Sequence, residues 1–187
     1  MNKRQSIPFV LLLAALLIWL FFKQEAVLPS LSVHHPSYIA TDINSTHFNK
    51  TGFLDYKIFA DKATNFNEDE LTNFKKPKVI VYTHNDQTDT TTIWQITSAV
   101  GALYQQDKLV LSKNVLVKNL SLDQLVQTIK TEQLTLFLDK KELSSDLLVT
   151  LEGPQIHQQG VGMWASLVTE EVIIKDQIKA VYFNENK

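Results

Sequence analysis

Apolar and polar residues alternate over several stretches of the chain beyond residue 36. The clearest stretch runs from Trp94 to Val117, where apolar residues recur at every second position before and after the Ser112–Asn114 segment. This period of two is typical of β-strands that bury one face. We therefore expect strands in this stretch, with a turn at Ser112–Asn114.

The pattern recurs further along the chain. Leu109 aligns with Leu143 and Val115 with Val149, so that each pair is 34 residues apart, and fainter copies flank these two. A period of this size is typical of stacked supersecondary units, none of which can bury its apolar face alone. The sequence therefore predicts an elongated all-β structure built from successive strand pairs.

Turn and loop signals divide the remaining segments, because glycine, proline and polar runs separate the apolar stretches. The expected segments are an edge strand at 37–49, a turn at 50–52, a hairpin tip at 65–70, a strand at 79–82, a polar loop at 83–92, a helical turn or loop at 120–127 and a turn at 153–154.

Residues of one parity form an apolar face along the successive units. Such a face suits either an ordinary sandwich core or a groove for an apolar ligand, and periodicity alone leaves both open. The set consists of Tyr56, Ile58, Trp94, Ile96, Leu109, Leu111, Val115, Val117, Leu136, Leu138, Val149 and Leu151.

The N-terminal segment from Ile7 to Phe22 is apolar throughout and is flanked by Lys3, Arg4 and Lys23. A helix of this length spans about 24 Å, which is a little short of a hydrocarbon core of about 30 Å. Long basic side chains at the ends can cover the difference. We expect a transmembrane helix. The alternative is a cleaved signal peptide, but no good small-x-small cleavage site follows.

The charges beside this anchor indicate its orientation in the membrane. Lys3 and Arg4 favour a cytoplasmic N-terminus, so the rest of the chain lies on the other side. We expect residues 1–23 to form a cytoplasmic tip and transmembrane anchor, residues 24–36 a tether, and residues 37–187 one folded domain, for which the length is adequate.

The composition narrows the possible partners. Three of the 18 basic residues lie beside the anchor, so residues 24–187 carry 15 basic and 20 acidic residues. This balance argues against nucleic acid, which requires a clustered basic surface. The chain has no cysteine, which excludes disulfides and thiolate chemistry.

No motif for catalysis or metal binding is evident. The chain lacks a nucleophile elbow and a glycine-rich phosphate loop. Glu68–Glu70 reads as a solvated turn rather than an acid/base pair. On an extended chain His34 and His35 point to opposite sides, so they do not share an ion. We expect no catalytic residue, no metal site and no cofactor.

The chain resembles the LptC family, which are membrane-tethered lipopolysaccharide-transport proteins of Gram-negative bacteria. The resemblance covers nearly the whole chain. It rests on several short motifs, on their order and spacing, and on their attachment to the N-terminal anchor. These motifs are Gly52 with Tyr56-x-Ile58-x-Ala60, Phe74-x-x-Pro77, Trp94-x-Ile96, Leu109-x-Leu111-x-x-x-Val115-x-Val117, Ser145-Asp146-x-x-Val149-x-Leu151-x-Gly153 and Gly160-x-x-Met163.

The resemblance implies a single-pass inner-membrane protein whose periplasmic domain is an antiparallel, twisted β-jellyroll, open at both ends, with an apolar interior for the acyl chains of lipopolysaccharide. The family accepts this lipid from an inner-membrane ABC transporter complex (LptB, LptF, LptG). It passes the lipid to LptA, a periplasmic bridge protein of the same fold, for assembly in the outer membrane. The resemblance implies no enzymatic activity. The alternative function is that of a membrane-anchored extracytoplasmic enzyme acting on envelope glycan.

The resemblance also assigns individual residues. Phe74 occupies the position of an aromatic residue that touches lipid, while Gly153 and Tyr182 match positions in the half that meets the bridge protein, and Val172 stands where the family can have a smaller residue. The expected lipid-binding residues are Phe74, Tyr56, Ile58, Trp94, Ile96, Leu109, Leu111, Leu136 and Leu138.

The pattern of the last unit by itself also predicts a role for this unit. Residues 172–183 are strand-like, and no further repeat follows that could pair with them. A terminal repeat normally carries a polar cap, so this strand is expected to be a docking edge. The expected partner-binding residues are Gly153, Val172, Ile174 and Tyr182.

Overall fold

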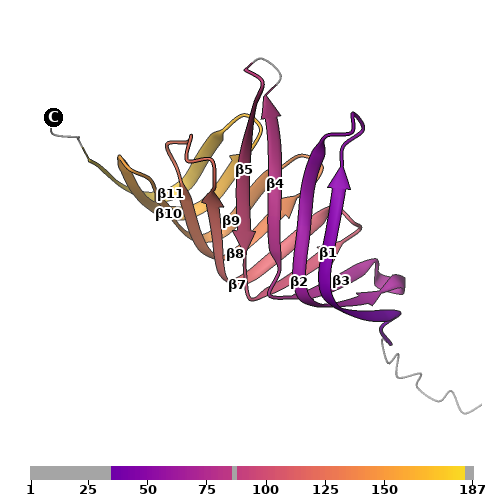
Figure 1. Cartoon of the computed structure of the whole chain (residues 1–187). Helices are drawn as coiled ribbons and strands as arrows, with labels where there is room; N and C mark the ends of the chain where they lie inside the picture. Colours follow the sequence, from indigo (N-terminus) through magenta and orange to yellow (C-terminus); the bar gives the residue numbers. More distant parts are fainter. Residues whose placement is uncertain (1–34, 86–87, 184–187) are drawn as a thin grey trace, which may run out of the picture. The chain divides into compact units, whose positions relative to one another are not determined.

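The computed structural model describes residues 35–85 and 88–183. These residues form one antiparallel sheet of eleven strands (Figure 1), which confirms the all-β antiparallel prediction. None of the helical segments in the described residues has the length and hydropathy needed to cross a membrane. The expected anchor at 7–22 lies outside the described residues.

Most of the strands are long, and one 3-10 turn, η1 (Asn67–Asp69), follows the second of them. The strands are β1 (Tyr38–Phe48), β2 (Leu54–Phe66), β3 (Leu71–Lys75), β4 (Lys78–Asn85), β5 (Thr90–Thr97), β6 (Val100–Tyr104), β7 (Lys108–Asn119), β8 (Thr128–Phe137), β9 (Glu142–Glu152), β10 (Ile156–Ser166) and β11 (Glu171–Tyr182).

A line of irregular residues, which we name the crease, crosses the sheet. At this line β3 gives way to β4 and β5 gives way to β6, and Lys76 N donates to Ala99 O while Ala99 N donates to Lys113 O. The ladders on β8, β9, β10 and β11 change register on the same line. Bulges of this kind bend strands and increase their twist. The crease therefore folds the sheet in two.

Each long strand contributes to both halves of the folded sheet. The first half of β2 pairs with β4 and its second half with β3, and β7 divides in the same way between β6 and β5. We name the halves after their short strands. The β4–β5 half also holds residues 43–48, 54–60, 115–119, 128–131, 149–152, 156–159 and 179–182. The β3–β6 half also holds residues 38–41, 62–66, 108–112, 135–137, 142–144, 163–166 and 171–174.

The core lies between the two halves. Val79 and Ile96 of the β4–β5 half are fully buried, as are Leu109 and Leu136 of the β3–β6 half. Since a strand exposes alternate residues on opposite faces, such burial requires the inner faces of the halves to cover each other. The predicted apolar parity is confirmed, because all of its members are buried except Tyr56, which is half-buried. This arrangement is jellyroll-like.

The sheet has two terminal strands. Within the described residues β1 pairs with β2 alone and β11 pairs with β10 alone, and the two lie at opposite ends of the sheet (Figure 1). The outer edges of β1 and β11 are therefore available to other strands.

The predicted turn at Ser112–Asn114 is wrong. β7 runs continuously through these residues, and Lys113 and Asn114 adopt left-handed backbone angles, with φ of 68° and 56°, at a bulge on the crease. A polar bulge interrupts alternation just as a turn does, so the pattern alone does not separate them. The predicted loop at 83–92 is also too long, because β4 extends to Asn85 and β5 begins at Thr90.

The prediction of successive strand pairs needs a second correction. β3 and β4 lie end to end on opposite sides of the crease, and so do β5 and β6. Some strands therefore pair with a strand that does not follow them in the sequence: β2 pairs with β4, β3 with β6 and β5 with β7. The 34-residue spacing remains meaningful, because a shift of 34 residues aligns the sequence of β7 with that of β9 and brings the bulges of the two strands to equivalent positions.

Candidate functional site

Two hollows lie between the halves of the folded sheet, and residues from both halves line each of them. The β1-end hollow has a volume of about 660 Å³ and is lined by β1, β2, β3 and β6. The β11-end hollow has a volume of about 210 Å³ and is lined by β5, β8, β9, β10, β11 and the loop at 120–127. A pocket that takes a drug-sized ligand usually measures about 300–1,000 Å³. The larger hollow is in that range.

The β1-end hollow contains three of the predicted site residues, Tyr56, Ile58 and Phe74. Ile58 and Phe74 are buried in the core cluster, whereas Tyr56 is half-buried and stacks on His47 with ring centroids 4.6 Å apart. The remaining wall is largely polar, and Asn65 Nδ2 donates to Thr72 Oγ1 at 2.8 Å. This hollow therefore joins an apolar floor to a polar rim.

The electrostatics around Tyr56 keep its hydroxyl neutral. Burial raises the pKa of Tyr56, and the negative charges of Asp139, Asp55 and Asp107 raise this pKa further. The phenol is therefore a neutral hydrogen-bond donor and acceptor at neutral pH.

The β11-end hollow contains the predicted Trp94 and Val172. The loop at 120–127 closes one of its walls with Leu125 and Val126, although sequence alone suggested a helical turn as one option for this loop. The loop has no helical residues. Trp94 is buried, and its Nε1 has no hydrogen-bond partner among the described residues.

Asp123 holds the loop at 120–127 in place. Thr92 Oγ1 donates to its Oδ2 at 2.8 Å, and Asn119 Nδ2 donates to its Oδ1 at 2.9 Å. Burial alone would raise the pKa of Asp123, but the hydrogen bonds from Thr92 and Asn119, with others, outweigh burial and hold this pKa below its ordinary value. The loop is thus anchored by an ionised carboxylate.

Acid should therefore release this loop. Because the folded-state pKa of Asp123 lies below the unfolded value of about 3.9, its contribution to stability is fully present above that value and is lost as the pH falls through the folded-state pKa. We expect the protection of amides in the loop at 120–127, measured by hydrogen exchange and corrected for the intrinsic exchange rate at each pH, to fall in acid. Asp123→Asn should exchange faster at neutral pH and show no further acid response there. An identical acid response in both proteins would exclude this anchor.

Gly153 is the predicted partner-binding residue that the structure places beside this loop. It lies in the β9–β10 turn, where its N–H donates to Ile156 O at 2.9 Å. A Cβ at this position would overlap the carbonyl oxygen of Leu125. Glycine is therefore needed here for the close approach of two backbones, whatever its role toward a partner.

Replacement of Gly153 by alanine should lower stability. The overlap is with a main-chain oxygen, so the loop at 120–127 must move, and we expect a loss of about 1–3 kcal/mol in urea unfolding. Pro154→Ala, at the exposed neighbouring position, is the matched control and should change little. Combining Gly153→Ala with Leu125→Ala should not restore stability, because the oxygen remains. Unchanged unfolding of Gly153→Ala would contradict this assignment.

Five predicted lipid-binding residues line neither hollow. They lie in the sealed core between the halves, where their side chains are at most 2% exposed. They are Ile96, Leu109, Leu111, Leu136 and Leu138. Because interiors are close-packed, a ligand can reach these five residues only if the two halves separate.

A salt bridge holds the halves together on the side opposite the crease, which we name the mouth. Lys141 lies in the β8–β9 turn of the β3–β6 half, and its Nζ is 2.6 Å from Asp55 Oδ1 on β2 of the other half. The same Nζ donates to Tyr82 O on β4 at 2.7 Å. Both charged side chains are largely buried, at 15% and 12% exposed. Lys141 and Asp55 therefore form a clasp across the mouth.

The remaining predicted partner-binding residues divide along β11. Ile174, at 9% exposed, packs in the core cluster, and Val172 packs against that cluster. Tyr182, at 70% exposed, lies on the free edge and is opposite Ile156 in the ladder. Tyr182 and Gly153 therefore lie near each other at one end of the β4–β5 half, while Val172 and Ile174 lie beyond the crease.

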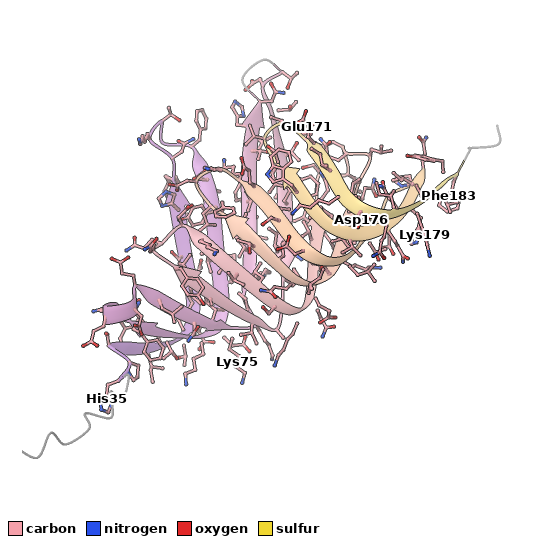
Figure 2. All side chains as sticks on the ribbon, turned by 180° about the vertical axis from the view of Figure 1, so that it is seen from behind. His35, Lys75, Glu171, Asp176, Lys179 and Phe183 are labelled. Carbon is pink, nitrogen blue, oxygen red and sulfur yellow. The ribbon has the colours of Figure 1, made fainter. Side chains whose placement is uncertain are left out.

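The free edge of β11 presents backbone groups of alternate residues. Phe183 N donates to Gln155 O at 3.1 Å, so in an antiparallel ladder the backbone groups of Val181 face β10 while those of Ala180 and Tyr182 face outward. Figure 2 shows Glu171, Asp176, Lys179 and Phe183 following one another along this outermost strand.

Sequence reasoning missed the clasp and the loop anchor. Lys141 and Asp55 are far apart along the chain, and neither lies in a recognisable motif. Asp123 lies in a polar segment that resembles any loop. Their roles arise only from the folding of the sheet. No group of three or more histidine, aspartate or glutamate side chains within 35–85 and 88–183 is placed to hold a metal ion.

A family model described as "Lipopolysaccharide-assembly, LptC-related" matches residues 9–183. The chain belongs to the LptC family. The match includes every strand of the folded sheet and most of the apolar segment at 7–22.

Individual LptC proteins show the same relationship at low identity. The chain is 25% identical over 160 residues to the Haemophilus influenzae protein, covering 79% of this chain and 77% of that protein. It is 22% identical over 152 residues to the proteins of Escherichia coli K12 and Shigella flexneri, covering 81% of this chain and 78% of each of theirs. All three are named lipopolysaccharide export system protein LptC.

Proposed function

We propose that this chain is a non-enzymatic component of lipopolysaccharide export that holds the acyl chains of the lipid between the two halves of its sheet. The observation that carries this proposal is the apolar interior, which has a hollow at each end and lies in a sheet whose two terminal strands have free edges. Membership of the LptC family supports the choice of lipopolysaccharide over other lipids.

The physical chemistry of acyl chains suits such an interior. Each methylene group moved from water to an apolar surface contributes about 0.8 kcal/mol, so binding needs a long lining and no reactive group. The resting hollows are too small for several chains at once. Loading therefore requires the mouth to open, which breaks the clasp between Lys141 and Asp55 and exposes the sealed core residues.

The terminal strands provide the route in and out. A strand with a free edge accepts a strand from a neighbouring protein, and a neighbour of the same fold would continue the apolar interior. We assign the β11 edge to the bridge protein LptA and the β1 end to the inner-membrane transporter complex (LptB, LptF, LptG). The lipid then moves from the β1-end hollow toward the β11-end hollow.

The same proposal covers membrane attachment. Residues 7–22 form the transmembrane helix, with residues 1–6 in the cytoplasm and the folded sheet in the periplasm, and residues 24–36 act as a tether. A protein purified from the inner-membrane fraction should retain Met1 through Phe22 by mass spectrometry, whereas a mature N-terminus near Val33 would indicate a cleaved signal peptide.

Substitution of Phe74 tests the binding role. Phe74→Asp places a charge in the apolar floor of the β1-end hollow, where an unpaired charge is strongly disfavoured. We expect lipopolysaccharide affinity to fall at least tenfold in a fluorescence-displacement assay. Phe74→Leu keeps the floor apolar and should bind within about threefold of wild type, a difference of less than about 1 kcal/mol.

Two controls make the result decisive. Leu148 is 60% exposed, so Leu148→Asp adds the same charge on the outside and should bind normally. Circular dichroism establishes that each variant is folded. A folded Phe74→Asp protein that binds lipopolysaccharide as tightly as wild type would show that the interior is only a core. Recovered lipopolysaccharide should be chemically intact, and a modified product would instead support an enzyme.

A further inference from the structure

Trp94 lines the β11-end hollow, and its indole nitrogen is covered in the resting structure. Trp94 is 5% exposed, and its Nε1 has no hydrogen-bond partner in the described part of the chain. An indole N–H only donates, so this group can be satisfied only by an acceptor. Trp164 offers a contrast, because its Nε1 donates to Glu142 Oε2 at 3.5 Å.

The surroundings of Trp94 define what that acceptor can be. Leu125, Ile129 and Leu167 contribute apolar side chains to the hollow that Trp94 lines. Most buried donors are satisfied by protein or by ordered water, and an ordered water needs two to four polar partners. An apolar wall favours an occupant that is itself apolar except for one acceptor.

The charge at the hollow disfavours one class of acceptor. Glu170 is the single charged residue in the lining, and it is exposed. A free carboxylate beside Glu170 would be repelled, whereas a neutral oxygen would not. The amide groups of Gln124 and Gln158, which are also in the lining, are partly exposed and have access to solvent.

We propose that, when loading separates the halves and uncovers Trp94 Nε1, the β11-end hollow selects acyl chains that carry a neutral oxygen acceptor, namely an ester carbonyl, an amide carbonyl or a chain hydroxyl, through donation from Trp94 Nε1–H. This inference rests on the proposed function, because it assumes that acyl chains enter between the halves. It adds a polar discrimination to a site that otherwise recognises only apolar surface. Plain hydrocarbon and free fatty acid are the disfavoured ligands.

Nuclear magnetic resonance of the indole proton tests this directly. The full chain, labelled with ¹⁵N-tryptophan, is placed in nanodiscs of ether-linked lipids, which lack carbonyl acceptors. Methyl dodecanoate, dodecanoate and the n-alkane of the same length as the ester are then titrated. We expect the Trp94 indole proton to move downfield with the ester and not with the alkane, and the Trp164 proton to stay unchanged.

The matched variants are Trp94→Phe, which keeps an aromatic ring and loses the donor, and Trp164→Phe, which loses a donor outside the hollow. We expect the wild-type chain and Trp164→Phe to bind the ester about fivefold more tightly than either other probe, as one ordinary hydrogen bond predicts. Trp94→Phe should bind the ester and the alkane equally.

Three results would overturn the inference. The first is equal binding of ester and alkane by the wild-type chain, and the second is an ester preference that survives in Trp94→Phe. The third is an indole proton already shifted downfield before any probe is added and unmoved by the ester, which would identify water as its acceptor. Lipopolysaccharide binding is measured on the same samples, so that wild-type binding without ester preference would reject this inference alone. Loss of lipopolysaccharide binding by the wild type would reject the proposed function.

Discussion

We expect Tyr182→Pro to abolish capture of LptA by the full-length chain and Tyr182→Val to preserve it. The N–H of Tyr182 faces outward from β11, so proline removes a donor that only a partner strand would use. Valine removes the aromatic side chain and retains the N–H. We expect a pull-down of LptA to fall below a tenth of wild type for Tyr182→Pro and to stay within about threefold for Tyr182→Val, which corresponds to less than about 1 kcal/mol.

A second proline separates docking from folding. The backbone groups of Val181 face β10, so Val181→Pro should break the ladder within the chain and lower its melting temperature. Tyr182→Pro should leave the melting temperature nearly unchanged. Deleting residues 177–187 should also abolish capture and leave the core intact, because residues 175–182 are exposed whereas Ile174 is buried. If Tyr182→Pro captured LptA normally, the docking edge would lie elsewhere.

This design corrects the choice of segment that the sequence suggested. The sequence pattern predicts that residues 172–183 form one docking strand, and a deletion of 172–187 would be the experiment that this prediction suggests. The structure places Val172 and Ile174 in or against the core, on the far side of the crease from Tyr182. Removing them would leave an apolar gap, and the loss of capture would then report unfolding.

We expect covalent closure of the mouth to abolish loading of lipopolysaccharide. The chain has no cysteine, so the pair Asp55→Cys and Lys141→Cys can be joined in place of the clasp by a bis-methanethiosulfonate reagent, which forms a reducible disulfide with each thiol and releases methanesulfinate. We expect affinity for lipopolysaccharide to fall at least tenfold in the joined protein and to return when the reagent is reduced. The physical reason is that the sealed core residues are reached only when the halves separate.

A matched pair on the outer surface controls for the chemistry of joining. Lys175 Nζ lies 3.1 Å from Asp146 Oδ1 beside the crease, and both side chains are exposed. Joining Asp146→Cys to Lys175→Cys restrains β9 and β11 without crossing the mouth, and binding should be unaffected. The unjoined Asp55→Cys and Lys141→Cys protein lacks the clasp and should load faster than wild type. Equal binding by the joined and reduced mouth variants would show that lipid does not enter there.

The regular strand faces were predictable from sequence because they depend on local alternation. Leu109 and Leu111 on one side of the β7 bulge and Val115 and Val117 on the other were assigned to one face, and all four are buried. Alternation is a local property, since each strand turns successive side chains to opposite faces. The outermost position of β11 was also expected from the sequence, and within the described residues β11 pairs with β10 alone.

The crease and the contacts across the mouth were not predictable in the same way. Lys113 and Asn114 interrupt the alternation as a turn would, and only the ladder with β8 shows that the strand continues. Lys141 and Asp55 meet because the crease folds one half of the sheet over the other. Such contacts depend on the register of many strands. The alternation of apolar and polar residues along the chain carries no information about these contacts.

Photocrosslinking from adjacent positions of β3 in living cells tests the central claim most directly. Phe74 is 7% exposed and faces the β1-end hollow, while its neighbour Lys75 is exposed on the outer surface (Figure 2). With benzoylphenylalanine in place of each residue in turn, illumination should join lipopolysaccharide to the protein at position 74 and not at position 75. Adducts at position 75, or none at position 74, would contradict the account that the lipid passes between the two halves of the sheet.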